Sequence, residues 1–363
     1  MPDTPSDGYE TRACSSADRE EQARLFNACF KKGANAKELA WRYDDGPHGA
    51  SLSFVTRDRE GRAVSGYACN PRVVRTFGEH AALVGETGDV MTHPDARGKG
   101  LFSELDRACM RAAGEAGWAA VFGLPNRRSA PIFTGKLGWH QVGTIRPHTF
   151  LFDGGARARR LRSREGRLAG FSAPFAARSC ARRRGALERA GGGFDTREVE
   201  RFPAEVAELD AALSKRFAFM VRRDADYLDW RFARNPSGLH RALVARRGAA
   251  FAGYVVVQLP REGEDVGFLV DVLAEDPAAH AALLSAGLER LEREGAVAAQ
   301  ATAIDGSWWQ DRLREAGFLD PKPENHLVVI SYLHDVDHPV ARVMLDAAQW
   351  YLTDGDRDDA TMG

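Results

Sequence analysis

The spacing of hydrophobic residues changes from a strand pattern to a helix pattern between residues 92 and 101. Apolar residues dominate the run that leads to Val90, which predicts a buried strand over residues 81–92. Pro94 lacks an amide hydrogen and therefore ends this strand. Beyond it, apolar positions recur at helical spacing: Leu101, Phe102, Leu105, Ala108 and Cys109. The pattern predicts a strand, a tight turn and a helix in succession.

The rest of the first half supplies the elements of a mixed α/β sheet. Apolar and alternating runs predict further strands at residues 9–14, 51–57, 63–69, 73–77, 119–123 and 141–150. Helical spacing predicts helices at residues 19–30, 38–43, 101–114 and 130–137. We expect one crossover helix, after strand 81–92, and we expect strand 141–150 to complete the sheet.

Two glycines with cationic neighbours occupy the turn between strand and helix. Gly98 and Gly100 alternate with Arg97 and Lys99. Glycines let backbone amides point outward together, and a helix N-terminus adds a partial positive charge. We refer to residues 97–102 as the glycine turn, and we expect it to bind an anion, most plausibly a pyrophosphate.

The glycine turn also resembles the acyl-CoA loop of the GCN5-related N-acetyltransferases. The family pattern is Arg or Gln, two residues, Gly, any residue, then Gly or Ala, and this chain departs from it only at Phe102. The resemblance implies the family's mixed sheet and acetyl-CoA as co-substrate. It also implies a set of cofactor-binding residues: Val90, Met91, Thr92, Arg97, Gly98, Lys99, Gly100, Leu101, Phe102 and Asn126.

Three residues are candidates for proton transfer. An amine must lose a proton before it attacks a thioester, and Glu86 and Asp89 lie on opposite faces of strand 81–92. Counted back from the glycine turn, Glu86 matches the general base of histone-acetylating relatives, whereas Asp89 is equally interpretable as a structural cap. Thr134 occupies the position at which relatives often carry a tyrosine that protonates the leaving thiolate.

The second half repeats the order of the first. Phe194–Val199 echoes Tyr9–Cys14, and the later pairs Gly253/Gly66, Asp271/Asp89 and Gly317/Gly138 follow with offsets of 187, 182 and 179. At an offset of 182, Arg97, Gly98 and Gly100 correspond to Ala279, His280 and Ala282. We therefore expect a second domain of the same fold without the anion-binding turn, which completes the substrate cleft or stabilises the first domain.

Composition limits the other possibilities. The chain has 363 residues, is 44% hydrophobic and 28% charged, and has a net charge of −1 with five scattered cysteines. This balance disfavours nucleic acid and membrane partners, and the cysteine spacing fits free thiols and no metal site. The first eight residues lack a basic stretch and an apolar core, so we expect a cytoplasmic protein. The oligomeric state stays open.

Four segments are expected. They are an acyltransferase domain at 1–152, an Arg-rich linker at 153–193, a degenerate domain at 194–335, and a C-terminal helix with an acidic tail at 336–363. The linker's arginines would suit a nucleic-acid or lipid patch, but the chain as a whole is near neutral and shows no fold signature for such a partner, which favours a solvated connector.

Acceptor-binding residues are the least constrained part of the sequence. Trp41 and Tyr43 are candidates, although their echo at Trp230–Phe232 also fits framework packing. Asp354 and Asp356 would attract a cationic amine if the tail is ordered.

The sequence therefore predicts an acyl-CoA-dependent N-acyltransferase that transfers an acetyl group directly to a primary amine of a small molecule or amino sugar. Two alternatives stay open. One is an aminoacyl-tRNA-dependent aminoacyltransferase with tandem domains of this fold, and the other is a non-catalytic CoA-binding scaffold or sensor.

Overall fold

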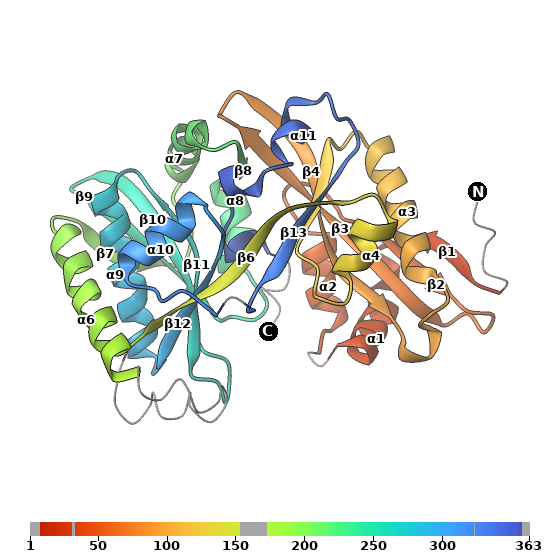
Figure 1. Cartoon of the computed structure of the whole chain (residues 1–363), viewed down its shortest axis with the longest axis horizontal. Helices are drawn as coiled ribbons and strands as arrows, with labels where there is room; N and C mark the ends of the chain where they lie inside the picture. Colours follow the sequence, from red (N-terminus) through yellow and green to blue (C-terminus); the bar gives the residue numbers. More distant parts are fainter. Residues whose placement is uncertain (1–7, 31–32, 153–172, 323, 358–363) are drawn as a thin grey trace. The chain divides into compact units, whose positions relative to one another are not determined.

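Two compact units make up the chain, and each contains parallel and antiparallel strands together with helices (Figure 1). The computed structural model describes residues 8–30, 33–152, 173–322 and 324–357. The first unit contains the residues up to Gly143 together with Leu327–Ala347. The second contains Thr144–His326 together with Ala348–Asp356, so each unit includes a segment from late in the chain.

The first unit has the spatial strand order β1–β2–β3–β4–β5–β13. Adjacent strands are antiparallel except β4 and β5, which are parallel because helix α3 crosses over between them. The strands are β1 (Glu10–Ala13), β2 (Leu52–Arg57), β3 (Ala63–Thr76), β4 (His80–Thr92), β5 (Ala120–Gly123) and β13 (Leu327–Leu333). The helices are α1 (Arg19–Cys29), α2 (Ala36–Tyr43), α3 (Leu101–Glu115), α4 (Ala130–Lys136) and α11 (Pro339–Val343).

The second unit repeats this arrangement with the order β7–β9–β10–β11–β12–β6. Its parallel pair is β11 and β12, joined by helix α9. The sheet strands are β7 (Asp195–Val199), β9 (His240–Arg247), β10 (Ala250–Gln258), β11 (Val266–Ala274), β12 (Ala298–Ile304) and β6 (His140–Leu151). The helices are α6 (Ala173–Ala190), α7 (Val206–Leu213), α8 (Ala225–Leu228), the π-helix η4 (Asp229–Ala233), α9 (Pro277–Arg293) and α10 (Trp308–Ala316).

The strand registers fix how the two units correspond. Val84 lies opposite Ala120 in the first unit, and Val266 lies opposite Ala298 in the second. The first strand of each pair is therefore offset by 182 residues (266 − 84), and the second by 178 (298 − 120). The predicted tandem fold is confirmed, and the second unit is four residues shorter between these strands.

The last strand of each sheet differs from the sequence-based expectation. Residues 141–150 were expected to complete the first sheet, but β6 pairs with β12 in the second unit, from Ile145 opposite Ile304 to Leu151 opposite Ala298. In the first unit β13 lies beside β5 instead, with Ile330 opposite Gly123. Periodicity predicts that a segment forms a strand, but it does not show which strand will be its partner.

Strand β3 also runs further than expected, straight through Pro71. The sequence suggested two strands, at 63–69 and 73–77, whereas β3 is continuous from Ala63 to Thr76. Strand β2 ends opposite Cys69, and the amide of Val73, two residues beyond the proline, points away from β4 to the His48 ring. Pro71 therefore lies where its missing amide hydrogen removes no hydrogen bond to β2 or β4.

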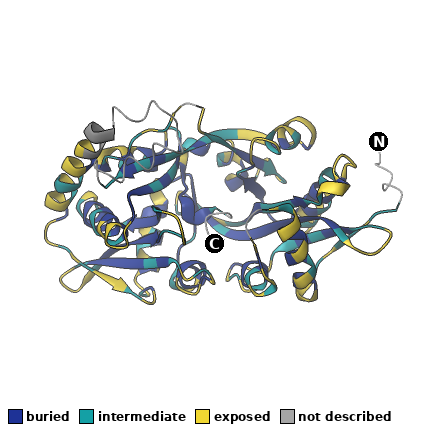
Figure 2. Cartoon of the chain, turned by 90° about the horizontal axis from the view of Figure 1, so that it is seen from below, coloured by how far each residue is buried: buried dark blue, intermediate teal, exposed yellow. Residues whose placement is uncertain are grey.

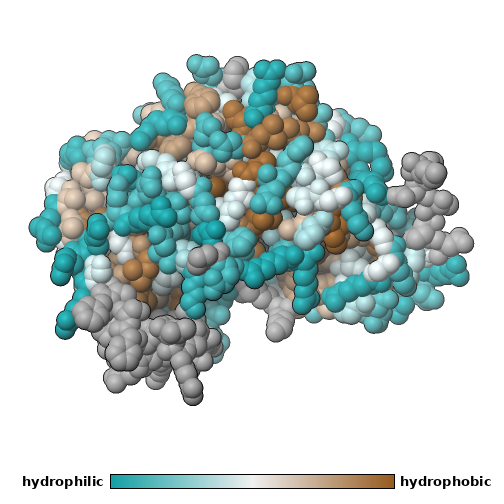
Figure 3. Space-filling model, in the orientation of Figure 1, coloured by the Kyte–Doolittle hydropathy of each residue, from teal (hydrophilic) through white to brown (hydrophobic). Residues whose placement is uncertain are grey.

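Burial follows the strands, and the outer faces of the helices are exposed (Figure 2). The face drawn in Figure 3 is largely hydrophilic, and among the described residues the exposed large apolar side chains are Phe30, Phe77, Val336 and Leu345. Part of the Arg-rich linker, residues 153–172, lies outside the described residues. The remainder is α6, which packs against α9 and α10 and buries Cys180 in the core of the second unit. No helix in the described part of the chain is long and apolar enough to cross a membrane.

Candidate active site

The glycine turn has the backbone geometry that the sequence predicts. After β4, the short 3-10 helix η2 (Pro94–Ala96) leads to Gly98 and Gly100, each in the left-handed region with φ of 78°. Residues that carry a Cβ rarely adopt this backbone conformation. A Cβ at either position would meet nothing within 4 Å. The turn is therefore open, and the space in front of it is available to a ligand.

Backbone amides and two cations surround this open space. Gly100 is the N-cap of α3, and the first amides of a helix have no acceptor within it. Lys99 Nζ lies 2.5 Å from the Tyr9 hydroxyl, and Arg97 Nε donates to the Thr92 carbonyl at 3.4 Å. Both cations are on exposed residues. This donor set fits a diphosphate.

Strands β4 and β5 separate next to the glycine turn. They pair only from Val84 to Thr87, so among the described strands β5 leaves residues 88–92 of β4 unpaired on that side. Asp89 has φ of 47°, which marks a bulge in the β3–β4 ladder. Val90, Met91 and Thr92 follow, with the Met91 side chain buried. The predicted cofactor-binding residues of β4 and of the glycine turn thus lie on one continuous stretch, residues 90–102.

Glu86 is enclosed in the protein. Its residue is 1% exposed, and its Oε2 lies 2.5 Å from Arg72 Nη2, a guanidinium that is itself buried. The buried carboxylate is thus paired with an opposite charge and has no contact with solvent on that side. The role of Glu86 as general base stays a prediction, and it requires the ion pair to open.

Asp89 is the carboxylate on the unpaired part of β4. It accepts a hydrogen bond from the Tyr43 hydroxyl and forms an ion pair with Arg42 Nη1 at 2.9 Å. Burial raises the pKa of Tyr43, and the Asp89 charge raises it further, so the phenol stays protonated as the donor. Trp41 and Tyr43 are buried on α2, and Tyr43 together with Arg42 holds Asp89 in place. This placement favours the framework interpretation of the Trp41–Tyr43 motif.

The predicted residues near α4 are exposed. The Thr134 hydroxyl donates to the Ala130 carbonyl one turn earlier, at 3.1 Å. The Asn126 side-chain oxygen accepts from the amides of Arg128 and Ser129, and so it stabilises the turn before α4. Asn126 lies three residues after the end of β5, and Thr134 lies on α4.

Phe102, which departs from the family pattern, packs on α4. Its ring meets that of Phe133 edge-on, with centroids 5.0 Å apart, and Phe133 in turn contacts Trp139. The larger side chain therefore lies against the helix, and the neighbouring glycines are left open.

One titratable residue of this region was missed in the sequence. Asp106 lies on the buried stripe of α3 and accepts hydrogen bonds from the Tyr67 hydroxyl at 2.8 Å and from Trp139 Nε1 at 3.4 Å. Burial raises the pKa of the Asp106 carboxyl to about 6, against the effect of these donors. A carboxylate on the apolar side of a helix was the available signal.

The corresponding helix of the second unit begins differently. Strand β11 ends at Ala274 and α9 starts at Pro277, so only Glu275 and Asp276 separate them. Asp276 Oδ1 accepts from the Ala279 amide at 2.7 Å, and Oδ2 pairs with Arg247 at 3.0 Å. The second unit thus lacks the glycine turn, as expected. The reason differs from the one expected, because the connection is shorter and Ala279, His280 and Ala282 lie within the helix.

The predicted acceptor residues Asp354 and Asp356 are ordered and buried in the second unit. They are 4% and 1% exposed. Asp354 bonds to Thr302, and the cation that Asp356 contacts is the chain's own Arg223. Attraction of a cationic amine by these residues stays a prediction that their burial does not favour. Asp358 and Asp359, in the same acidic tail, lie outside the described residues.

Comparisons with known proteins agree with this geometry. Residues 10–142 match the family described as acetyltransferase (GNAT) domain. A comparison with curated protein sequences finds no match.

Solved structures show the same fold. The chain is similar to a GCN5-related N-acetyltransferase from Anabaena variabilis, with a TM-score of 0.61 and 12% identity over 90% of this chain and 73% of the other. A second from Kribbella flavida gives 0.58 and 12% over 90% and 71%. A tandem GNAT protein from the clavulanic acid biosynthesis pathway gives 0.55 and 15% over 90% and 99%. Residues 10–142 therefore match an acetyltransferase (GNAT) domain, in a chain that has the tandem form of this fold.

Proposed function

We propose that the first unit is an acyl-CoA-dependent N-acyltransferase that uses acetyl-CoA and transfers the acetyl group directly to a primary amine. The observation that carries this proposal is the open glycine turn at the start of α3, with Gly98 and Gly100 at φ of 78° and two cations beside them. A turn of this kind binds phosphate groups through backbone amides. The matched family and the separation of β4 from β5 support the same assignment.

The chain's own groups divide the work between binding and catalysis. The glycine turn with Arg97 and Lys99 holds the diphosphate of the donor, whose thioester supplies the acyl group. The amides of Val90 and Thr92 lie along the unpaired edge of β4, where they would hydrogen-bond the donor arm and stabilise an oxyanion. Asn126, at the end of β5, borders the same space.

Asp89 is better placed than Glu86 to influence the amine proton. It lies on the unpaired part of β4, whereas Glu86 lies on the paired part and faces Arg72. Thr134 is a poor acid, and its hydroxyl is used within α4. The thiolate of coenzyme A is weakly basic, so its departure does not depend on an acid at this position.

The acceptor is expected to be an amine-bearing small molecule or amino sugar. One observation favours the second candidate, a CoA-binding protein without catalysis: neither Glu86 nor Thr134 is poised for proton transfer in this structure. Binding and turnover therefore have to be measured separately.

The first experiment measures acetyl-CoA affinity by calorimetry for the native chain and for the double variant Gly98→Val/Gly100→Val. Loss of about two charge-assisted hydrogen bonds predicts an affinity lower by about 100-fold. Gly117→Val is the matched control, because Gly117 has φ of 75°, open surroundings and a position at the other end of α3. Unchanged affinity in a folded double variant would refute the proposal.

The second experiment follows release of the coenzyme A thiol with a panel of amines. Turnover supports the enzyme. Binding without turnover on any amine would support the CoA-binding protein, and absence of binding to the native chain would favour the aminoacyl-tRNA-dependent class.

A further inference from the structure

The C-terminal segment, Trp350–Asp356, is built into the second unit. Strand β14 (Trp350–Tyr351) pairs in parallel with β8 (Phe219–Val221), and the short helix η6 (Asp354–Asp356) follows. Every residue from Trp350 to Asp356 is buried. An acidic terminal stretch is ordinarily solvated, so its burial requires specific partners.

Those partners lie on the two strands that separate in the second unit. Strands β11 and β12 pair only from Val266 to Phe268, and helix η6 contacts both strands beyond that point. On β12, Thr302 donates to the Asp354 carboxylate from its amide at 2.6 Å and from its hydroxyl at 2.5 Å. On β11, Asp271 accepts from the Thr353 hydroxyl at 2.8 Å.

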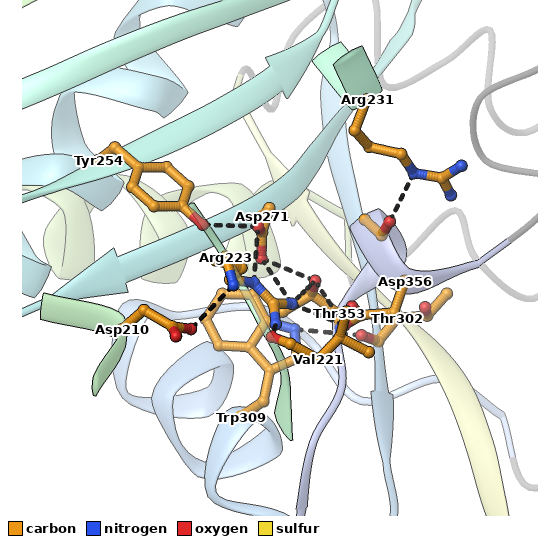
Figure 4. Close-up of polar contacts among 11 residues, drawn as sticks. Asp210, Val221, Arg223, Arg231, Tyr254, Asp271, Thr302, Trp309, Thr353 and Asp356 are labelled. Atoms are coloured by element: carbon orange, nitrogen blue, oxygen red, sulfur yellow. Dashed lines mark hydrogen bonds and ion pairs between the residues drawn. The ribbon is translucent and has the colours of Figure 1, made fainter. Parts of the chain in front are cut away.

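A buried arginine holds the other side of the turn (Figure 4). Arg223 donates to Asp356 at 2.7 Å and to Asp271 at 3.0 Å, and it is 1% exposed. The Tyr254 hydroxyl donates to Asp271 at 2.8 Å. The two carboxylates thus share one guanidinium, and each has a further donor from a hydroxyl or amide.

The turn fits without spare room. A Cβ on Gly355 would lie 2.9 Å from the Phe232 ring and 3.1 Å from Asp271 Cβ. The Gly355 carbonyl accepts from Arg231 Nε at 2.8 Å. The surroundings of the turn therefore require a glycine at position 355, a hydrogen bond to its carbonyl, and carboxylates beside it.

The register offsets identify this place in the fold. With offsets of 182 and 178, Asp271 corresponds to Asp89 and Thr302 to Leu124. The separated strands that enclose the turn are thus the counterparts of β4 and β5. In the first unit the corresponding stretch of β4 pairs with β3, and β5 does not pair with it on the other side.

We propose that the second unit contains a binding site for an acidic turn of sequence Thr-Asp-Gly-Asp, filled in cis by residues 353–356. The segment acts as a resident ligand of the second unit, in the place where the first unit keeps its strands available. This inference concerns the second unit alone and holds whether or not the first unit transfers an acyl group.

The test displaces the turn in the full chain and offers it back as a peptide. Gly355→Leu introduces a side chain where there is no space, and hydrogen exchange of the amides of residues 350–356 is expected to accelerate by about 100-fold. Gly192→Leu is the control, because a Cβ there would meet its nearest atom at 3.4 Å and Gly192 also lies in the second unit.

A synthetic peptide with the sequence of residues 348–357 is then added to the Gly355→Leu variant. We expect saturable binding and renewed protection of β11 and β12, and no binding of the same peptide with both aspartates changed to asparagine. Asp354→Asn is the milder variant to use if Gly355→Leu does not fold. Unaltered exchange in the folded variants, or equal binding of both peptides, would overturn the proposal.

Discussion

Helices α3 and α9 occupy the same place in the two units, yet they begin in opposite ways. Eight residues, 93–100, connect β4 to α3, and they end in glycines with positive φ and exposed cations. Two residues connect β11 to α9, and the carboxylate of Asp276 already occupies the first amides of that helix. The N-terminus of α3 is open to an anion, whereas the N-terminus of α9 is already capped by the carboxylate of Asp276.

The difference teaches that the fold and the helix dipole do not by themselves make an anion site. Both helices have a partial positive charge at the N-terminus. In the second unit an internal carboxylate satisfies it, and the Ala279 amide and Arg247 lower the pKa of Asp276. The length and glycine content of the connection therefore decide which unit is able to bind a phosphate group.

The largest expected effect concerns the buried histidine of α9. Burial lowers the pKa of His280 from 6.5 to about 3, so the second unit must hold it neutral. Between about pH 6.5 and pH 3 the unfolded chain binds one proton that the folded chain does not. The free energy of unfolding therefore decreases as the pH is lowered through this range, by up to about 5 kcal/mol. His280→Phe keeps the ring between Trp308 and Trp309, and it should weaken this dependence in urea unfolding followed from pH 7 to 4. Burial also lowers the pKa of His240 to about 3, so the part due to His240 should remain. Parallel curves for the two proteins would contradict the assignment.

The buried carboxylate of Asp106 on α3 should give a pH dependence of stability with the opposite sign. Because the pKa of Asp106 is raised from 3.8 to about 6, the folded first unit binds the proton more tightly than the unfolded chain does. Its contribution is complete below about pH 4 and is lost as pH rises through 6, by about 3 kcal/mol. Asp106→Asn keeps an acceptor for Tyr67, and the variant should unfold with no such loss. Asp95→Asn, which changes an exposed carboxylate in the same unit, serves as the control.

A charge exchange at the glycine turn sharpens the comparison further. Gly100→Asp places a carboxylate at the N-cap of α3, as Asp276 does for α9, and we expect acetyl-CoA affinity to fall by about 100-fold. Gly100→Asn has the same shape without the charge, and both residues tolerate positive φ. Asparagine should therefore cost about tenfold or less in affinity. Equal acetyl-CoA affinities of the two variants would show that the negative charge at position 100 does not compete with the bound anion.

The reverse change in the second unit should have a small effect. Asp276→Ala removes an N-cap and is expected to destabilise the second unit by about 1 kcal/mol. Acetyl-CoA stoichiometry should stay at one per chain, because the short connection still lacks the glycines. Calorimetry that found a second site in this variant would break the comparison.

The smallest effect is expected at Lys99, an exposed cation beside the glycine turn. Lys99→Met should weaken acetyl-CoA binding by about fivefold at low salt, with the difference shrinking as ionic strength rises. Lys215→Met, an exposed change in the second unit, should leave affinity unchanged. A salt-independent loss at Lys99 would indicate a contact other than charge.

Local signals carried most of what the sequence could predict. The period change around Pro94, together with Gly98 and Gly100, lies within one stretch of chain, and the structure reproduces the strand, turn and helix there. The repeat was detectable because its matches keep their order. Pro71 was misleading, since its effect depends on where β2 ends.

Long-range pairings could not be predicted. Strand β6 pairs with β12 and β13 pairs with β5, over separations of more than 140 residues that no local pattern encodes. Burial of Asp356 depends on Arg223, which is 133 residues away in the sequence. The enclosure of Glu86 likewise depends on Arg72, which a count back from the glycine turn does not reveal.

The exchange of β6 and β13 has a consequence for biosynthesis. Until residue 333 has left the ribosome, β5 has an open edge, and the first unit cannot finish its sheet. A gene cut within the Arg-rich linker would give two fragments that each lack a strand held by the other. A gene for either half alone would therefore encode an incomplete sheet. Once the two units had exchanged these strands, both halves had to stay in one chain.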